Sequence, residues 1–344
     1  MATPKQFHWI MSVPVGVIIS IFGLIGNAIS IIIWKRILKK NFGRNKSTAI
    51  YLIALAMADS GLLIFFLLDD TLPKIFPSLL SSISYCYFHC YVGFPFFFYF
   101  IASSIWLVVC VTFNRFIMVN FPVKAKDFCS PSRAYLGISI TLAFCFFVNI
   151  PHFLNFEPSN TDGNDTECFK PSKYGSSKGA VNYEFWVHCI FLVLAPWASI
   201  AFFNGGIIRA LQKRAEQASK KFSKSRDSKE HDQQMTRMLL AVTFTFLVLL
   251  AWQCITQCFF MLGYNGRKGE KWDHVDKAFA FAKLGVIINS SVNFLLYNLS
   301  GSMFRKELLT IFGRSPSNKY LSGSSASGGT KITNESISAS ESQM

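Results

Sequence analysis

The stretch Cys86–Pro122 reads CYFHCYVGFPFFFYFIASSIWLVVCVTFNRFIMVNFP, and Arg115 is its only Lys, Arg, Asp or Glu. As a helix rising ~1.5 Å per residue, the segment from Cys90 to Arg115 would span ~37 Å, more than the ~30 Å hydrocarbon core of a bilayer. We therefore expect Cys90 and Arg115 at opposite membrane faces. A thiol suits the oxidising outer side, and a basic residue suits the cytosolic side.

Six further apolar stretches are long enough to cross a bilayer, which predicts an all-α membrane protein with a seven-transmembrane helix bundle. The chain has 344 residues, of which 51% are hydrophobic and 36 are Phe, and its net charge is +15. A soluble domain rarely combines this hydrophobicity with this excess of basic residues. The seven predicted spans are residues 11–34, 48–68, 86–114, 134–156, 185–208, 238–264 and 278–299.

The charges of the loops orient these spans. Most of the 34 Lys and Arg residues follow spans one, three and five or lie in the C-terminal tail, together with fewer than half of the 19 acidic residues. By the positive-inside rule, residues 1–10 are an outer N-terminal segment and residues 313–344 are a cytoplasmic tail of a multi-pass membrane protein. The basic residues are divided among short loops, which favours contact with membrane lipid over binding of nucleic acid.

An amphipathic pattern follows the seventh span. Phe304, Leu308 and Phe312 recur at helical spacing beside two basic residues. This pattern predicts a short amphipathic eighth helix on the inner leaflet, so that residues 11–312 form one membrane domain. The tail beyond is rich in Ser, Gly, Asn and Thr and is predicted to be disordered, with hydroxyls that a kinase could phosphorylate.

Asp59 lies near the middle of span two, where a carboxylate is costly and needs partners. Ser104 lies at a similar depth, and Asn289 and Asn293 belong to one polar stripe on span seven. Spacing alone favours a hydrogen-bonded network that joins the helices. The alternative is a hydrated cation site with these oxygen-bearing residues: Asp59, Ser104, Asn289, Ser290 and Asn293.

The predicted outer loop between spans four and five carries two features of extracellular chains. It contains Cys168 and the glycosylation acceptor Asn164 in Asn164-Asp165-Thr166. One disulfide to Cys168 is expected. Cys86 and Cys90 are one helical turn apart, and the residues alone leave open which of them is the partner.

A series of short motifs follows in order through residues 26–312. They are Gly26-Asn27, Leu55-Ala56-Met57-Ala58-Asp59, Cys90 with Cys168, Asn114-Arg115-Phe116 with Pro122, Pro196, Trp252, Asn289-Ser290-Ser291-Val292-Asn293-Phe294-Leu295-Leu296-Tyr297 and Phe304-Arg305. Taken together, these motifs resemble those of the rhodopsin-like (class A) G-protein-coupled receptors. The resemblance implies a receptor for an extracellular ligand, not an enzyme, that acts on a heterotrimeric G protein, with receptor kinase and arrestin as further partners at the tail.

The resemblance also assigns roles. It implies the disulfide Cys90–Cys168, and it implies an allosteric sodium ion at the Asp59 site, with no other cofactor. Asn114 stands where the family usually has an acid, so some basal signalling is expected. The G-protein coupling residues that the resemblance implies are Asn114, Arg115, Phe116, Pro122 and Tyr297.

The expected ligand pocket is aromatic with a few polar groups. Lys283 is interpreted either as an anchor for an anionic group of the ligand or as a lysine that extends to the outer interface. Phe97 stands where amine receptors place an aspartate, and Ile287 where opsins place the retinal lysine, which disfavours both ligand classes. The predicted lining is Phe94, Phe97, Phe98, Trp186, His188, Trp252, Gln253, Gln257, Phe260 and Lys283.

The run from residue 289 to residue 297 resembles that of invertebrate neuropeptide receptors, particularly those for FMRFamide-like peptides, so a neuropeptide is the expected ligand. A lipid or a small anionic ligand is the alternative. A seven-helix transporter or channel is disfavoured because the sequence shows no internal repeat and one buried acid. The six histidines are scattered without metal-ligand spacing, which disfavours a metalloenzyme.

Overall fold

The computed structural model describes residues 4–40, 45–159, 169–220, 236–249, 251–252 and 270–311, and this part of the chain is almost entirely helical. The predicted all-α fold is confirmed. Six helices are long and apolar enough to cross a membrane, and a shorter apolar helix, Thr236–Leu249, covers part of the sixth predicted span. The six are Gln6–Lys39, Lys46–Ile75, Ile83–Asn120, Pro131–Leu154, Lys178–Arg214 and Ala280–Ser300.

Several spans combine α-helix with short stretches of other helix types. The N-terminal half contains α1 (Pro4–Ile10), η1 (Met11–Val15), α2 (Gly16–Lys39), α3 (Lys46–Phe65), η3 (Phe66–Thr71), α4 (Leu72–Ile75), η4 (Pro77–Ser81), α5 (Ile83–Phe88), η5 (His89–Gly93) and α6 (Phe94–Asn120). The remainder contains α7 (Ala125–Phe128), α8 (Pro131–Asn149), η6 (Ile150–Leu154), β1 (Phe156–Pro158), β2 (Phe169–Pro171), α9 (Lys178–Trp186), η7 (Val187–Leu194), α10 (Ala195–Lys220), α12 (Glu270–Ser300) and α13 (Ser302–Ile311).

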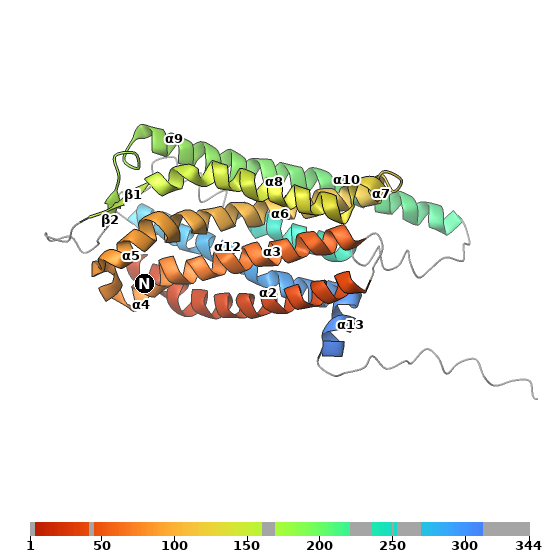
Figure 1. The fold of residues 1–344 in the computed structure, drawn as a ribbon, viewed down its shortest axis with the longest axis horizontal. Coiled ribbons are helices and arrows are strands. Elements are labelled where there is room, and N and C mark those ends of the chain that lie inside the picture. Colours follow the sequence, from red (N-terminus) through yellow and green to blue (C-terminus); the bar gives the residue numbers. More distant parts are fainter. Residues whose placement is uncertain are drawn as a thin grey trace, which may run out of the picture.

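The long helices lie side by side along the longest axis of the molecule (Figure 1). α3 packs between α2 and α6, α12 packs against α2, and α10 packs against α6. The antiparallel strands β1 and β2 lie at the same end as the N-terminus, and α7 and α13 lie at the other. We call these the hairpin end and the α13 end. Helices suit a bilayer because they satisfy their backbone polar groups internally.

The first helix begins earlier than predicted. Residues 4–10, which the sequence placed in an extracellular tail, form α1 and run directly into the first span. Phe7 of this extension packs on Phe281 of α12, with ring centroids 5.3 Å apart. A contact between distant segments therefore extends the helix beyond its most apolar stretch.

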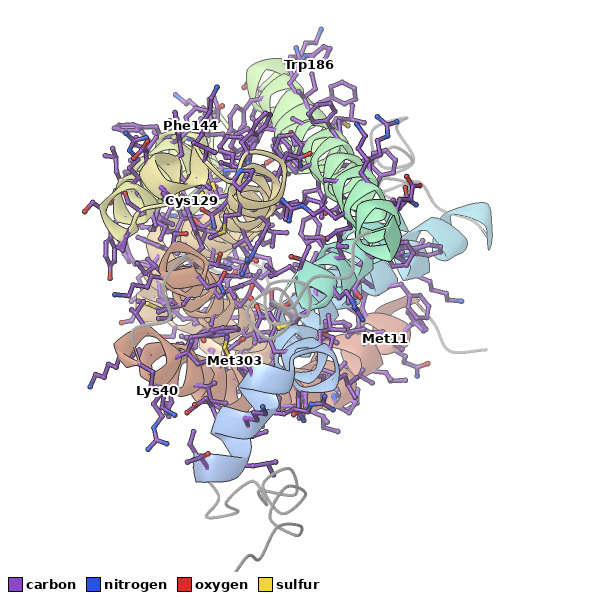
Figure 2. All side chains as sticks on the ribbon, turned by 90° about the vertical axis from the view of Figure 1, so that its right-hand side faces the viewer. Met11, Lys40, Cys129, Phe144, Trp186 and Met303 are labelled. Carbon is purple, nitrogen blue, oxygen red and sulfur yellow. The ribbon has the colours of Figure 1, made fainter. Side chains whose placement is uncertain are left out.

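The distribution of side chains is that of a protein surrounded by lipid. Ile18, Phe202 and Leu299 are 69%, 69% and 73% exposed, whereas Asp59 is fully buried. Phe144 and Trp186 likewise lie at the edge of the bundle when it is viewed end-on (Figure 2). Large outward-facing apolar surfaces are expected where acyl chains replace water. The chain is thus a multi-pass membrane protein.

α13 crosses the end of the bundle at a steep angle to α12 (Figure 1). Phe304 packs against Trp34 of α2 and Tyr297 of α12, each at 5.6 Å between ring centroids. An ion pair between Glu307 and Lys40 joins α13 to the end of α2. α13 lies within the stretch for which the sequence predicts an amphipathic helix on the inner leaflet, and its place on a membrane stays a prediction. Phe312 and the predicted tail lie outside the described residues.

Candidate functional site

The centre of the bundle contains a carboxylate held by several helices. Ser104 Oγ of α6 donates to Asp59 Oδ1 at 2.6 Å, and Asn293 Nδ2 of α12 donates to Asp59 Oδ2 at 2.8 Å. Asn27 Nδ2 of α2 donates to the Ser290 carbonyl at 3.0 Å. The predicted network between helices therefore exists, and it joins α3 to α6 and α12, and α12 to α2.

A small cavity adjoins this network. Ser104, Asn289 and Ser290 supply polar atoms to its wall, and the buried Ser290 hydroxyl lies beside the Asp59 carboxylate. The volume open to the centre of a water molecule is about 20 Å³, enough for one water-sized particle. The apolar part of the wall comprises Leu62, Ile101, Ile105, Phe246, Leu249, Gly285 and Val286.

The residues around this cavity fit a hard cation. Asp59 supplies one negative charge, and the hydroxyl and amide oxygens around it are the neutral ligands that such cations prefer. All five residues predicted for the site belong to the network or to the cavity wall: Asp59, Ser104, Asn289, Ser290 and Asn293.

At the α13 end, Arg115 lies buried near the end of α6 and is 2% exposed. Its Nη1 donates to Asn45 Oδ1 at 3.0 Å, and Asn45 directly precedes α3. The neighbouring Asn114 is turned toward α3: it donates to Thr48 Oγ1 at 2.9 Å and accepts from Ser47 Oγ at 3.2 Å.

Cys129 borders this site from the segment after α7. Its thiol donates to the Asn114 carbonyl, with sulfur and oxygen 3.7 Å apart. Burial raises the pKa of the Cys129 thiol, and the charge of Arg115 offsets this only in part. The group is therefore a neutral thiol near neutral pH, and its role at this site is to pack and to donate.

The five predicted coupling residues do not form a single cluster. Phe116 packs on Phe203 of α10 at 5.4 Å, and Pro122 is exposed beyond α6. Tyr297 is buried against Trp34, at 5.7 Å between ring centroids. Asn114 and Arg115 thus lie with the start of α3, whereas Tyr297 belongs to the packing between α2, α12 and α13.

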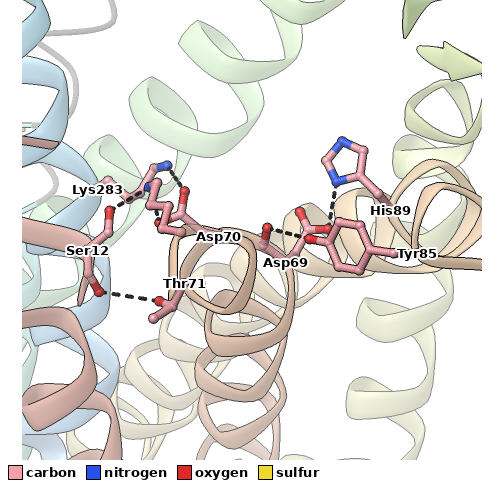
Figure 3. A network of polar contacts seen from close by, with 8 residues as sticks. Ser12, Asp69, Asp70, Thr71, Tyr85, His89 and Lys283 are labelled. Atoms are coloured by element: carbon pink, nitrogen blue, oxygen red, sulfur yellow. Dashed lines mark hydrogen bonds and ion pairs between the residues drawn. The ribbon is translucent and has the colours of Figure 1, made fainter. Parts of the chain in front are cut away.

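At the hairpin end, one carboxylate binds two ammonium groups (Figure 3). Lys283 Nζ of α12 is 2.6 Å from Asp70 Oδ1, and Lys74 Nζ is 2.9 Å from Asp70 Oδ2. Lys74 also donates to Ser12 Oγ of the first span at 2.8 Å. These contacts tie the first, second and seventh predicted spans together. Lys283 therefore pairs with Asp70. The sequence had suggested either a ligand anchor or a lysine that extends to the outer interface, and neither interpretation included this partner.

Asp69, which directly precedes Asp70, binds residues on the side of η3 that faces away from α12. His89 Nδ1 donates to Asp69 Oδ1 at 2.8 Å, and the Tyr85 hydroxyl donates to the Asp69 carbonyl at 3.1 Å (Figure 3). His89 in turn stacks on Phe169 of β2 at 4.0 Å between ring centroids. The π-helical turn η3 thus joins α12 on one side and the hairpin on the other.

The predicted ligand-pocket residues do not converge on one described cavity. Phe94 and Phe98 pack together at 4.9 Å, and Phe98 stacks on His152 at 4.6 Å; Phe97 packs beside Phe98. Trp186 is 58% exposed and Trp252 is 47% exposed, so their place in the ligand pocket stays a prediction. Only the backbone of His188, in η7, is described. Gln253, Gln257 and Phe260 lie outside the described residues.

The structure corrects the disulfide that the family resemblance implied. Cys86 is disulfide-bonded, and Cys90 is a buried free thiol. Cys90 lies in the π-helical stretch η5, whereas Cys86 lies in the preceding helix α5. Cys168 and the glycosylation acceptor Asn164 lie outside the described residues.

Three residues that form polar contacts at these sites were not predicted from the sequence: Asn45, Asp69 and Asp70. Asn45 lies in the short basic connection between the first and second spans, and the two acids directly follow the end predicted for span two. The signal that could have found Asp70 is its charge, opposite to that of Lys283 at the same membrane face. Nothing local in the sequence marks Asn45 as a partner of Arg115.

Comparisons with known proteins show which sequences this chain resembles. Residues 26–297, well over half of the chain, match the family described as 7 transmembrane receptor (rhodopsin family). An FMRFamide receptor of Drosophila melanogaster is 28% identical over 88% of this chain and 54% of that protein. An FMRFamide peptide receptor of Caenorhabditis elegans is 23% identical over 86% and 67%. A B1 bradykinin receptor of Macaca fascicularis is 25% identical over 61% and 58%. The chain spans about half the length of the Drosophila relative.

Proposed function

Because the chain belongs to the rhodopsin family of seven-transmembrane receptors, we propose that it transmits the binding of an extracellular neuropeptide to a heterotrimeric G protein. The observation that carries this proposal is the family match, together with a buried carboxylate that ties α3 to α6 and α12. Two relatives named as FMRFamide receptors, which match most of this chain, support a peptide of that type as the ligand.

The proposed topology has seven spans, with the N-terminus and the hairpin end outside the plasma membrane and the C-terminus in the cytosol. Thr236–Leu249 belongs to the sixth span in this scheme, and α13 is the amphipathic helix on the inner leaflet. The excess of basic residues in the loops and tail at the α13 end supports this orientation. Receptor kinase and arrestin are the proposed partners of the tail.

The proposed mechanism is a shift between two arrangements of the bundle. Ligand at the hairpin end repacks the polar core around Asp59, and the inner ends of α10 and the Thr236–Leu249 helix separate from α6. One described contact would have to change: Arg214 Nη2 of α10 donates to the Val119 carbonyl of α6 at 2.5 Å. The hydrogen bond from Asn204 Nδ2 to Thr243 Oγ1, at 2.8 Å, joins the two moving helices to each other. The opening gives the G protein access to Arg115.

We propose the cavity beside Asp59 as the site of an allosteric sodium ion. The carboxylate and the hydroxyls of Ser104 and Ser290, which lie beside it, support this proposal. Such an ion would neutralise the buried charge and favour the arrangement in which the helices stay together. The chain's own contribution is the oxygen ligands, which α3, α6 and α12 hold close to one another.

An anionic ligand, such as a lipid or a small carboxylate, is the second candidate. Two lysines share the single carboxylate of Asp70, so this cluster carries a net positive charge, and the Lys283 side chain is 39% exposed. A ligand carboxylate could replace Asp70 as the partner of Lys283. An amidated peptide has no C-terminal carboxylate, so its affinity should not depend on this exchange.

The experiment is a G-protein dissociation assay in cells that express the full chain, with each peptide supplied as the amide and as the free acid. Activation by amidated FMRFamide-type peptides, with little change in Lys283→Ala, supports the proposed function. A requirement for a free carboxylate, with a loss of potency of tenfold or more in Lys283→Ala at equal surface expression, would replace it with the anionic ligand. Ligand-independent solute flux would instead indicate a transporter.

A further inference from the structure

The arginine at the α13 end is held by a residue outside its own helix. Arg115 Nη1 donates to Asn45 Oδ1 at 3.0 Å, across 70 positions of sequence. Asn45 is 8% exposed, so this hydrogen bond is shielded from solvent. Asn45 lies in the connection between the first and second spans, directly before Lys46 begins α3.

The residue next to Arg115 on α6 has a different role. Asn114 uses its amide nitrogen on Thr48 and its amide oxygen on Ser47, which fixes α6 to the start of α3. Because Asn114 is uncharged and turned toward α3, it is not the group that restrains the Arg115 guanidinium. Ser47 and Thr48 follow Asn45 closely, so the same segment holds both Asn114 and Arg115.

We propose that Asn45 is the positioning residue for Arg115, and that its neutral amide oxygen sets how strongly the receptor is held in the state without G protein. This inference rests on the proposed function. A hydrogen bond from a guanidinium to a neutral oxygen is weaker than one to a carboxylate. Asn45 therefore restrains Arg115 only moderately, and a single change of chemistry at residue 45 tunes basal signalling in either direction.

Two substitutions at this position test the inference through opposite effects. Asn45→Ala removes the acceptor and is expected to raise basal G-protein dissociation roughly two- to tenfold, the change that one net hydrogen bond makes to an equilibrium. Asn45→Asp has the same size but presents a carboxylate, and it is expected to lower basal signalling and to raise the peptide concentration needed for half-maximal response. Full-length variants are compared at matched surface expression.

Asn120→Ala is the matched control. Asn120 lies on the same helix near the same membrane face, and its Nδ2 donates to the Phe116 carbonyl at 3.1 Å. Its basal signalling should equal that of the wild type. If Asn45 has only a structural role, basal G-protein dissociation should change in the same direction in Asn45→Ala and Asn45→Asp, or both variants should lose surface expression.

The outcomes separate the inference from the function on which it rests. A wild type that responds to peptide, with Asn45→Ala and Asn45→Asp indistinguishable from it in basal signal and potency, overturns the role of Asn45 and leaves the receptor function standing. A wild type that gives no more G-protein dissociation than empty cells, with or without peptide, overturns the proposed function and the inference together.

Discussion

At the scale of single residues, the choice between Cys86 and Cys90 as the disulfide partner determines how the hairpin end is covalently joined. Both cysteines are buried, but only Cys86 is disulfide-bonded. The partner is not among the described residues, and we propose Cys168 because the next residue, Phe169, stacks on His89, three positions from Cys86. A disulfide at this point would fasten the hairpin to the outer end of α5.

Cys86→Ala is expected to release one additional free thiol elsewhere in the chain and to reduce surface expression, since a native disulfide typically contributes about 2–4 kcal/mol of stability. Cys90→Ala should remove one free thiol and leave the disulfide intact. Thiol labelling of the denatured, unreduced receptor followed by mass spectrometry measures both. Retention of the disulfide in Cys86→Ala and its loss in Cys90→Ala would restore the pairing that the family resemblance implied.

Asp59 is the residue whose role the sequence predicted best. Its depth and the polar stripe on α12 pointed to Ser104 and Asn293, and both donate to its carboxylate. The contact of Asn45 with Arg115 could not be predicted in the same way. It depends on how the connection before α3 packs against α6, and sequence spacing carries no information about such packing.

Asp59→Asn removes the negative charge from the central cavity while keeping the size of the side chain. We expect the wild type to show lower peptide affinity in sodium than in an equal concentration of a large organic cation, by roughly three- to tenfold, and we expect the substitution to abolish that difference. Peptide binding to membranes in the two salts measures it. An equal sodium effect in the variant would place the ion elsewhere, and no sodium effect in the wild type would contradict the site.

At the scale of elements, η3 links two neighbours that lie far from it in the sequence. Asp70 binds Lys283 of α12, and Asp69 binds His89 of η5. The helical spans themselves followed from hydropathy, because about twenty apolar residues per crossing is a strong signal. The ends of the spans could not be predicted from hydropathy, because polar contacts such as these allow helices to extend past the apolar stretch.

A double-mutant cycle on Asp70 and Lys283 measures this link. Because both side chains are partly exposed, each change to Ala is expected to destabilise the receptor only modestly, with a coupling of about 1 kcal/mol between them. Lys74→Ala with Asp70→Ala provides a second cycle within one helix. Thermal unfolding of the detergent-solubilised receptor gives the stabilities, and strictly additive effects of Asp70→Ala and Lys283→Ala would show that the pair does not join the helices.

At the scale of the whole molecule, the length and number of the apolar stretches predicted an all-α membrane protein, and the exposed apolar surface agrees with this prediction. The predicted ligand pocket stays a prediction: Phe94 and Phe98 pack with each other, and Trp186 and Trp252 are exposed. An aromatic side chain near the end of a span suits the helix interface, the membrane interface and a ligand site equally. The sequence pattern therefore identifies these aromatic residues, but it does not show whether each one contacts another helix, lipid or ligand.

In the proposed mechanism, a peptide bound at the hairpin end activates a G protein through Arg115. Nucleotide exchange on a purified heterotrimeric G protein, catalysed by the receptor reconstituted in lipid with an amidated FMRFamide-type peptide, tests this coupling. The peptide is expected to accelerate exchange with the wild type, whereas Arg115→Ala should bind the peptide but lose at least tenfold of the acceleration. Undiminished exchange by Arg115→Ala at equal peptide occupancy would contradict it.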